Sequence, residues 1–276
     1  MNKIYISADV EGLNGITSFR QVLPEFAADY AQMRPQLHLE LNALIKGIKE
    51  AGVKNILVND AHNTMTNINL SELDYSVQLI SGKPKKVSMM YGLDETFDGI
   101  IFFAYHAKAG SAGVLAHTFN MYFKNVYLND KKISEAQLNG IYAKTLNVPI
   151  ILASGDNIFC EELKQDLGNI ATIETKKAIS NTAAMCNTNA ELLLKYEEFG
   201  KNINNLEKFS YQTSPIYKLR IELEDDGMAK QISTATSLVQ EENYICFTSK
   251  NYTEIYTTLQ KISAETTLRK SQNQQV

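Results

Sequence analysis

Short apolar runs alternate with helical patterns along the first half of the chain. These runs predict strands at residues 4–8, 56–58, 77–80, 99–105 and 148–153. The run at 99–105, GIIFFAY, has no polar alternation, which is typical of a strand that is buried on both faces. Strands that alternate with helices favour an α/β fold, with a largely parallel sheet and flanking helices.

Helical periodicity is clearest in two segments. The apolar face of the first consists of Leu37, Leu41, Leu44, Ile45 and Ile48, and Gly52 follows its end as a helix-terminating residue. The second covers residues 135–146. It follows a predicted hairpin, in which residues 126–128 and 132–133 flank the turn Asn129-Asp130. A shorter helix is expected through Met90 and Leu93.

The second half of the chain is less regular. We expect a helix at 160–167, a strand at 170–175, a polar helical stretch at 187–209, strands at 216–223 and 244–249, and a last helix at 252–270. The pattern therefore predicts an α/β domain over residues 1–200 and a smaller C-terminal α+β region over residues 201–276.

Composition narrows the class of protein. The chain has 276 residues, of which 44% are hydrophobic and 21% are charged, as is usual for a globular protein. Its 31 acidic and 27 basic residues give a net charge of -4, without the clustered lysines and arginines that bind nucleic acid. No apolar run has the length of a membrane span, and the N-terminus reads as a strand rather than a secretory signal. We expect a cytoplasmic protein with neither a nucleic-acid nor a membrane partner.

Known sequence motifs exclude further classes. Cys160, Cys186 and Cys246 are far apart and form no CxxC pair, which argues against a zinc finger or a disulfide framework. The chain has no HExxH, GxSxG or Walker motif. The segment GLNG at residues 12–15 lacks the GxGxxG pattern of a dinucleotide site.

Acidic and histidine side chains follow three of the predicted strands. Asp9 and Glu11 come directly after the first strand, and their spacing of two puts both on one face of an extended backbone. His62 follows the second strand and His106 follows the fourth. Ligands of open α/β sheets bind outside the carboxyl ends of the strands, so we expect these side chains to converge there.

Two carboxylates and two imidazoles at one sheet edge indicate a metal site. A divalent cation removes the repulsion that would otherwise raise the pKa values of carboxylates crowded in a dry cleft. Imidazole and carboxylate ligands without thiolate suit zinc, manganese or cobalt. Glu135, which begins the helix after the hairpin, is the fifth candidate. Five ligands exceed one tetrahedral site but match two metals ~3.5–4 Å apart if one carboxylate bridges them.

Each residue on its own also has an ordinary interpretation. Asp9 and Glu11 could be solvated residues at a strand end, His62 could lie in a turn, and His106 could be a hydrogen-bonded core histidine. Their shared position at one predicted edge favours the site. His38 lies on a helix near no other candidate, so we interpret it as structural or as a surface residue.

Three neighbouring features stay open. Asp60 is either a partner that supports His62 or the cap of a turn. The loop AGSAGV at 109–114 either approaches a ligand through its backbone or only permits a tight path of the chain. The segment KPKK at 83–86 is most simply a solvated loop.

In these residues and the segments around them, the chain resembles the zinc-dependent D-aminopeptidases of peptidase family M55. The matching segments occur in the family's order over roughly the first 160 residues, and they are SADVEGLNGI, LVNDAH, LISG, SMMYGLDETFDG, FAYHAKAGSAGVLAHTF, YLND followed by SE, and VPIILASGDN. TKKAIS near Lys176 is a weaker match, and the C-terminal third matches poorly.

The resemblance implies a di-zinc aminopeptidase. The two Zn²⁺ ions per chain would be held by Asp9, Glu11, His62, His106 and Glu135, with Asp9 as the bridge. His117, in the small-residue loop after His106, would be catalytic. The expected reaction removes D-amino acids, notably D-alanine, from the N-terminus of short peptides. The expected assembly is a homo-oligomeric, decamer-type ring that encloses its active sites.

Several functional alternatives follow from the same residues. His117 would donate a proton to the leaving nitrogen, stabilise the oxyanion or act as a nucleophile, the last being disfavoured because a metal-bound hydroxide already supplies one. A different di-metal amidase or deacylase on the same scaffold is one rival function. A non-catalytic, metal-dependent assembly protein is the other, although such a protein would not need His117.

Overall fold

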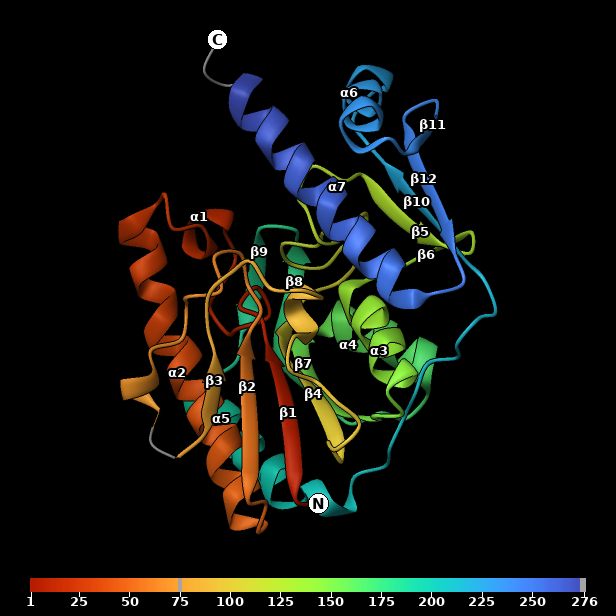
Figure 1. Ribbon diagram of the computed structural model, residues 1–276. Helices are drawn as coiled ribbons and strands as arrows, with labels where there is room; N and C mark the ends of the chain where they lie inside the picture. The colour runs from red at the N-terminus through yellow and green to blue at the C-terminus, as the bar shows by residue number, and fades with distance from the viewer. Residues whose placement is uncertain (74–75, 274–276) are drawn as a thin grey trace.

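The computed structural model describes residues 1–73 and 76–273, and a seven-stranded sheet runs through its larger part (Figure 1). Its strand order is β3-β2-β1-β4-β7-β8-β9. The strands are β1 (Lys3–Ala8), β2 (Asn55–Asp60), β3 (Gln78–Ile80), β4 (Gly99–Tyr105), β7 (Ile150–Asp156), β8 (Thr172–Ser180) and β9 (Ala183–Cys186). All neighbours are parallel except β8 and β9. The predicted α/β fold with a largely parallel sheet is confirmed.

Helices cover both faces of this sheet. The helices α1 (Phe19–Val22), α2 (Ala27–Glu50) and α5 (Asn189–Lys201) pack on one face, and α3 (Glu135–Thr145) and α4 (Asn157–Leu167) pack on the other. Within β1, Ile4 and Ile6 pack into the core beneath α2 and α5, and Tyr5 packs into the core beneath α3 and α4. Burial on both faces explains why the central strands are apolar without alternation.

The C-terminal part contains a second sheet, which is antiparallel and has the order β11-β12-β10-β5-β6. Its elements are β5 (Asn125–Leu128), β6 (Lys131–Lys132), β10 (Tyr217–Glu222), α6 (Asp226–Thr236), β11 (Val239–Glu241), β12 (Tyr244–Ser249) and α7 (Tyr252–Asn273). Both turn residues of the predicted hairpin, Asn129 and Asp130, have the left-handed backbone that such a turn requires.

The hairpin β5–β6 lies within residues 1–200 but pairs with strands from beyond residue 200. The second sheet thus takes strands from both sides of residue 200. The domain division near residue 200 stays a prediction.

Short elements account for most differences from the sequence pattern. The strand β9 and the helix α1 were not expected, because each has only four residues and too little periodicity to recognise. The helix expected through Met90 is a single 3-10 turn, Ser88–Met90. Two further 3-10 turns are Leu70–Glu72 and Ile203–Asn205. No helix within the described residues has the length and apolar character needed to cross a bilayer.

The long helix α7 packs beside α3 and joins the two parts of the molecule (Figure 1). Its hydroxyl groups bind α3 directly: Tyr252 donates to the carbonyl of Leu138 over 2.7 Å, and Tyr256 donates to Asn139 Oδ1 over 2.6 Å. Asn139 in turn donates to the hydroxyl of Tyr105 at the end of β4. The C-terminal region is therefore connected by buried hydrogen bonds to the carboxyl edge of the main sheet.

Candidate metal centre

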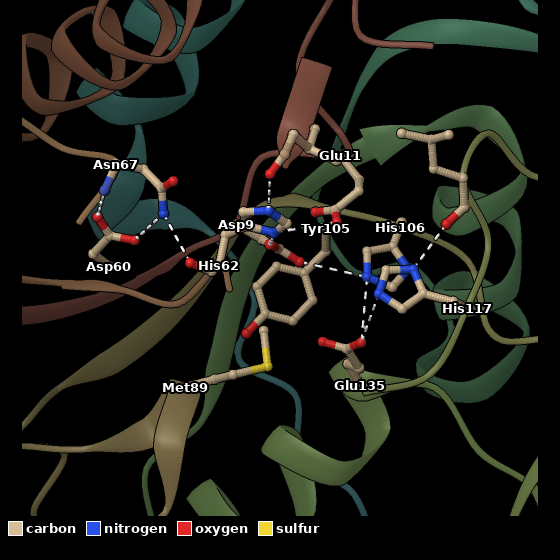
Figure 2. A network of polar contacts seen from close by, with 12 residues as sticks. Asp9, Glu11, Asp60, His62, Asn67, Met89, Tyr105, His106, His117 and Glu135 are labelled. Carbon is tan, nitrogen blue, oxygen red and sulfur yellow. Dashed lines mark hydrogen bonds and ion pairs between the residues drawn. The ribbon is translucent and has the colours of Figure 1, made fainter. Parts of the chain in front are cut away.

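The five candidate ligands converge at the carboxyl edge of the main sheet (Figure 2). They follow β1 (Asp9, Glu11), β2 (His62) and β4 (His106), or begin α3 (Glu135). The strand β1 lies between β2 and β4, and Ala8 pairs with Asp60 on one side and Phe103 on the other. Because the strands end in register, Asp9, His62 and His106 meet at one place, and the start of α3 adds Glu135.

Asp9, Glu11 and His62 form a first group of three. His62 Nδ1 lies 3.2 Å from Asp9 Oδ1 and 3.1 Å from Glu11 Oε1. All three residues are buried, with exposed fractions of 8% or less. One nitrogen and two carboxylate oxygens therefore face a common point, as the ligands of a metal ion do.

Asp9 also belongs to a second group, with His106 and Glu135. His106 Nε2 lies 3.5 Å from Asp9 Oδ2 and 3.3 Å from Glu135 Oε1. The two oxygens of the Asp9 carboxylate thus face different imidazoles, one in each group. This arrangement matches a carboxylate that bridges two cations.

The imidazole rings are oriented by backbone carbonyl groups. His62 Nε2 donates to the carbonyl of Val22 over 2.7 Å, and His106 Nδ1 donates to the carbonyl of Ala107 over 3.1 Å. A carbonyl oxygen only accepts hydrogen bonds, so the nitrogen facing it carries the hydrogen. The opposite nitrogen of each ring is left for a metal, as is usual for metal-bound histidines.

Within the cluster, two buried polar atoms, His106 Nε2 and Glu11 Oε2, have no hydrogen-bond partner. Both point into the cluster, and an unpaired polar atom in a protein interior is costly. A cation between these groups would satisfy both atoms at once. The donor set, its burial and these unpaired atoms fit transition-metal ions such as zinc.

Charges within the cluster are strongly coupled. Burial and the nearby charge of Glu11 raise the pKa of Asp9 to about 8. Burial would also raise the pKa of Glu11, but the charge and hydrogen bond of His62, together with the charges of His106 and His117, hold it well below its usual range. Burial would lower the pKa of His106, but the charge and hydrogen bond of Glu135, together with the charges of Glu11 and Asp9, raise it to about 10. Protons thus supply the positive charge that buried carboxylates need, and a divalent cation can replace them.

His117 lies beside the cluster. Its ring stacks on that of His106, with centroids 4.0 Å apart, and its Nε2 is 3.7 Å from Glu135 Oε1. Its Nδ1 donates to the carbonyl of Leu115 over 2.9 Å, which leaves Nε2 directed at the cluster. Burial, and then the charge of His106, lower the pKa of His117. A ring nitrogen of His117 also lies within 4.8 Å of ligand atoms of Glu11 and His106, so geometry permits either a catalytic or a ligand role.

The loop that carries His117 is held rigidly. Asp156 accepts a hydrogen bond from Val114 N over 2.6 Å and also caps α4 through Phe159 N. A Cβ on Gly113 would lie 2.7 Å from the Cβ of Ala107, so only glycine permits this close path. The residues 109–114 do not line the cleft. Of the two interpretations of the AGSAGV loop, the tight path of the chain is correct.

Asp60 is a turn cap. Its carboxylate accepts from the backbone nitrogens of Asn67 and Ile68 and from Asn67 Nδ2, while Asn67 Nδ2 also donates to the carbonyl of His62 (Figure 2). Asp60 therefore shapes the backbone that carries His62, whereas the His62 ring is oriented by Val22. His38 is structural: its ring links the carbonyl of Arg34 to the backbone nitrogen of Asn69.

Lys176 is a buried residue of this region that sequence reasoning did not single out as functional. Its ammonium donates to the carbonyls of Glu11, Leu13 and Ile16, and so holds the segment that follows β1. Burial lowers its pKa to about 8. The only signal in the sequence was the weak family match TKKAIS.

The cluster opens into a cleft of about 730 Å³. One wall is the carboxyl edge of the main sheet, and the opposite wall includes Gln260, Ser263 and Thr267 of α7. Phe19 and Phe119 add aromatic surface near His117. The volume is of the size that takes a small ligand.

Comparisons with known proteins agree with this geometry. The model of the family Peptidase_M55, described as D-aminopeptidase, matches residues 2–261. The D-aminopeptidase of Bacillus subtilis (strain 168) is 31% identical over 264 residues, which are 92% of this chain and 94% of that protein. A solved structure, the Zn-dependent D-aminopeptidase DppA from Bacillus subtilis, a self-compartmentalizing protease, superimposes with a TM-score of 0.90 at 28% identity. The match covers 96% of this chain and 98% of that one.

Proposed function

The chain belongs to the M55 family of D-aminopeptidases, and we propose that its buried cluster is a di-zinc centre with which it removes N-terminal D-amino acids from short peptides. The protein is a metal-dependent peptidase, and D-alanine is its preferred N-terminal residue. The observation that carries the proposal is the position of Asp9 between two groups of ligands.

Each group would hold one cation. Asp9, Glu11 and His62 would bind the first, and Asp9, His106 and Glu135 the second. Asp9 would bridge the two ions through its separate oxygens. Zinc bound by these residues would supply Lewis-acid chemistry, which polarises a carbonyl and lowers the pKa of a bound water.

His117 acts on protons. Its Nδ1 is held by the carbonyl of Leu115, so Nε2 is the atom that accepts a proton from the attacking water and passes it to the leaving nitrogen. The side chain lines the cleft beside the metal ligands Glu11 and His106. A general acid–base role is favoured over a nucleophilic one, because the metal centre already provides the nucleophile.

Selection of D-residues follows from a three-point attachment. The amine, the scissile carbonyl and the side chain of the first residue must each have a fixed place. Inverting the α-carbon drives the side chain into the wall or moves the carbonyl off the attacking oxygen, and such misplacement costs orders of magnitude in rate.

Metal analysis together with peptide hydrolysis tests the proposal. We expect close to two zinc ions per chain, loss of activity on chelation and recovery when zinc is restored. The kcat/KM for D-alanyl amides should exceed that for L-alanyl amides by at least about 100-fold. Full activity without metal would overturn the metal centre, and equal rates for the two enantiomers would overturn the D-specific assignment alone.

We also propose that the chain forms a closed, decamer-type ring in the cytoplasm. The support is its likeness to the self-compartmentalizing protease over 98% of that chain. Mass photometry of the purified protein tests the assembly, and a monomer at micromolar concentration would contradict it.

A further inference from the structure

The cleft has a cationic wall as well as an acidic one. Lys83 and Lys85, from the segment that the sequence suggested was merely solvated, both line it. Lys85 is half-buried, whereas its neighbours Lys83 and Lys86 are exposed. The segment 83–86 is therefore partly built into the site.

The ammonium of Lys85 is held in place by neutral oxygens. It donates to Asn59 Oδ1 over 2.5 Å and to the carbonyl of Asp60 over 2.6 Å. The charge of Asp60 acts on this ammonium, but the Asp60 carboxylate itself accepts hydrogen bonds from Asn67 and Ile68. An ammonium has three hydrogens to donate, so one donor of Lys85 has no protein partner among the described residues.

Lys85 lies at the same sheet edge as the metal centre. Asn59 and Asp60 end β2, and Asp60 pairs with Ala8, which directly precedes Asp9. The two oxygens that hold Lys85 therefore belong to the end of the strand next to β1, and Lys85 lines the same cleft as Asp9 and His62. Gln260 of α7 donates to the carbonyl of Lys85 over 3.0 Å and so fixes the segment from the far wall of the cleft.

We propose that Lys85 binds the C-terminal carboxylate of a short peptide whose N-terminal residue occupies the metal centre. This subsite rests on the proposed aminopeptidase function. A carboxylate that enters a confined cleft loses its hydration and needs a cation with a free donor, which Lys85 supplies. The enzyme then selects peptides with a free α-carboxylate one or two residues beyond the scissile bond, and it disfavours longer or amidated peptides.

Two substrates that differ only at the C-terminus test the subsite. The zinc-loaded enzyme is assayed on D-alanyl-glycine and on D-alanyl-glycine amide, in the wild type and in Lys85→Met, Lys85→Arg and the control Lys86→Met. Lys86→Met removes the same charge from an exposed position that does not line the cleft. Zinc content is measured for every variant.

We expect the wild type to prefer the free acid by on the order of 10- to 100-fold in kcat/KM, mainly through KM. Lys85→Met should lose this preference by slowing only the acid, Lys85→Arg should retain part of it, and Lys86→Met should keep all of it.

Equal wild-type rates on acid and amide would overturn the subsite without touching the aminopeptidase function. A loss in Lys85→Met that is equal for both substrates would overturn it too, because Lys85 would then only support the fold. Hydrolysis of neither peptide by the wild type would overturn the aminopeptidase function and the subsite together.

Discussion

The two parts of this molecule differ in what they bury. Among the described residues, every buried charged or histidine side chain lies between positions 9 and 176, in the part built on the parallel sheet. In residues 201–272, apart from the tyrosines, the buried polar side chains are the two threonines Thr236 and Thr266. Each of these threonines donates its hydroxyl hydrogen to a carbonyl one helical turn before it, so neither needs a partner from elsewhere.

Sheet type explains this difference. The central strands β4 and β7 are buried at all seven positions, so the side chains at their carboxyl ends are also shielded from solvent. Charged groups that enter there find partners from neighbouring strands. In β10 of the antiparallel sheet, Tyr217, Leu219 and Ile221 are buried, while the intervening residues face outward. The charged side chains of the C-terminal part are therefore not buried in its core. This part forms one wall of the cleft through α7.

The largest effect is expected from Asp9, the residue shared by both groups of ligands. Asp9→Asn should lose both metal ions and at least about 1,000-fold in kcat/KM, since bound metal contributes several kcal/mol to the transition state. Metal analysis and kinetics check this outcome. The control Asp130→Asn changes an exposed turn residue and should leave both unchanged. Retention of one metal in Asp9→Asn would show that Asp9 is not the bridge.

The two stacked histidines should separate metal binding from turnover. His106→Ala should lose metal and activity together, whereas His117→Ala should keep its metal and lose roughly 100- to 10,000-fold in kcat. Because the two rings are stacked on each other, the same substitution at each histidine serves as the control for the other. Loss of zinc from His117→Ala would identify His117 as a ligand.

Buried charge outside the metal centre should appear in the pH dependence of stability. Burial raises the pKa of Glu40 from 4.5 to about 7, although Asn14, Gln36 and Tyr196 donate hydrogen bonds to its carboxylate. Between those pH values the unfolded chain releases the proton that the folded chain keeps, so the free energy of unfolding falls as pH rises.

Glu40→Gln removes this contribution. Relative to the wild type, the unfolding free energy of the variant should rise by about 3 kcal/mol between pH 4.5 and pH 8, as measured by urea denaturation. Glu95→Gln, at an exposed position, should follow the wild-type profile. A difference that does not depend on pH would mean that Glu40 is already ionised in the folded protein.

The smallest effect is expected from the C-terminal region. Tyr256→Phe leaves Asn139 Oδ1 without its donor and should lower the unfolding free energy by about 1–2 kcal/mol, with kcat changed less than about threefold. The matched substitution Tyr91→Phe, at a residue that is 46% exposed, should change neither. A large loss of kcat with zinc retained would place the C-terminal region in catalysis rather than in support of the cleft.

The sequence was informative where local spacing carries the signal. The strand β4 begins and ends where GIIFFAY does, and β12 likewise matches the expected range 244–249. Asp9, Glu11, His62 and His106 each follow the end of a predicted strand. The carboxyl ends of parallel strands share one edge, so the sequence also predicted that these residues would meet. Glu135 was found because it begins a helix that a hairpin precedes.

Only the tertiary structure decided which groups are partners. The hairpin β5–β6 was predicted, but its place in the second sheet depends on β10, about 90 residues later. The nitrogen that each histidine offers to a metal is selected by distant carbonyls, such as that of Val22 for His62. Lys85 and Lys176 acquire their positions from oxygens of other segments. Periodicity reports the neighbours of a residue within a few positions, whereas these contacts join segments that only the folded chain brings together.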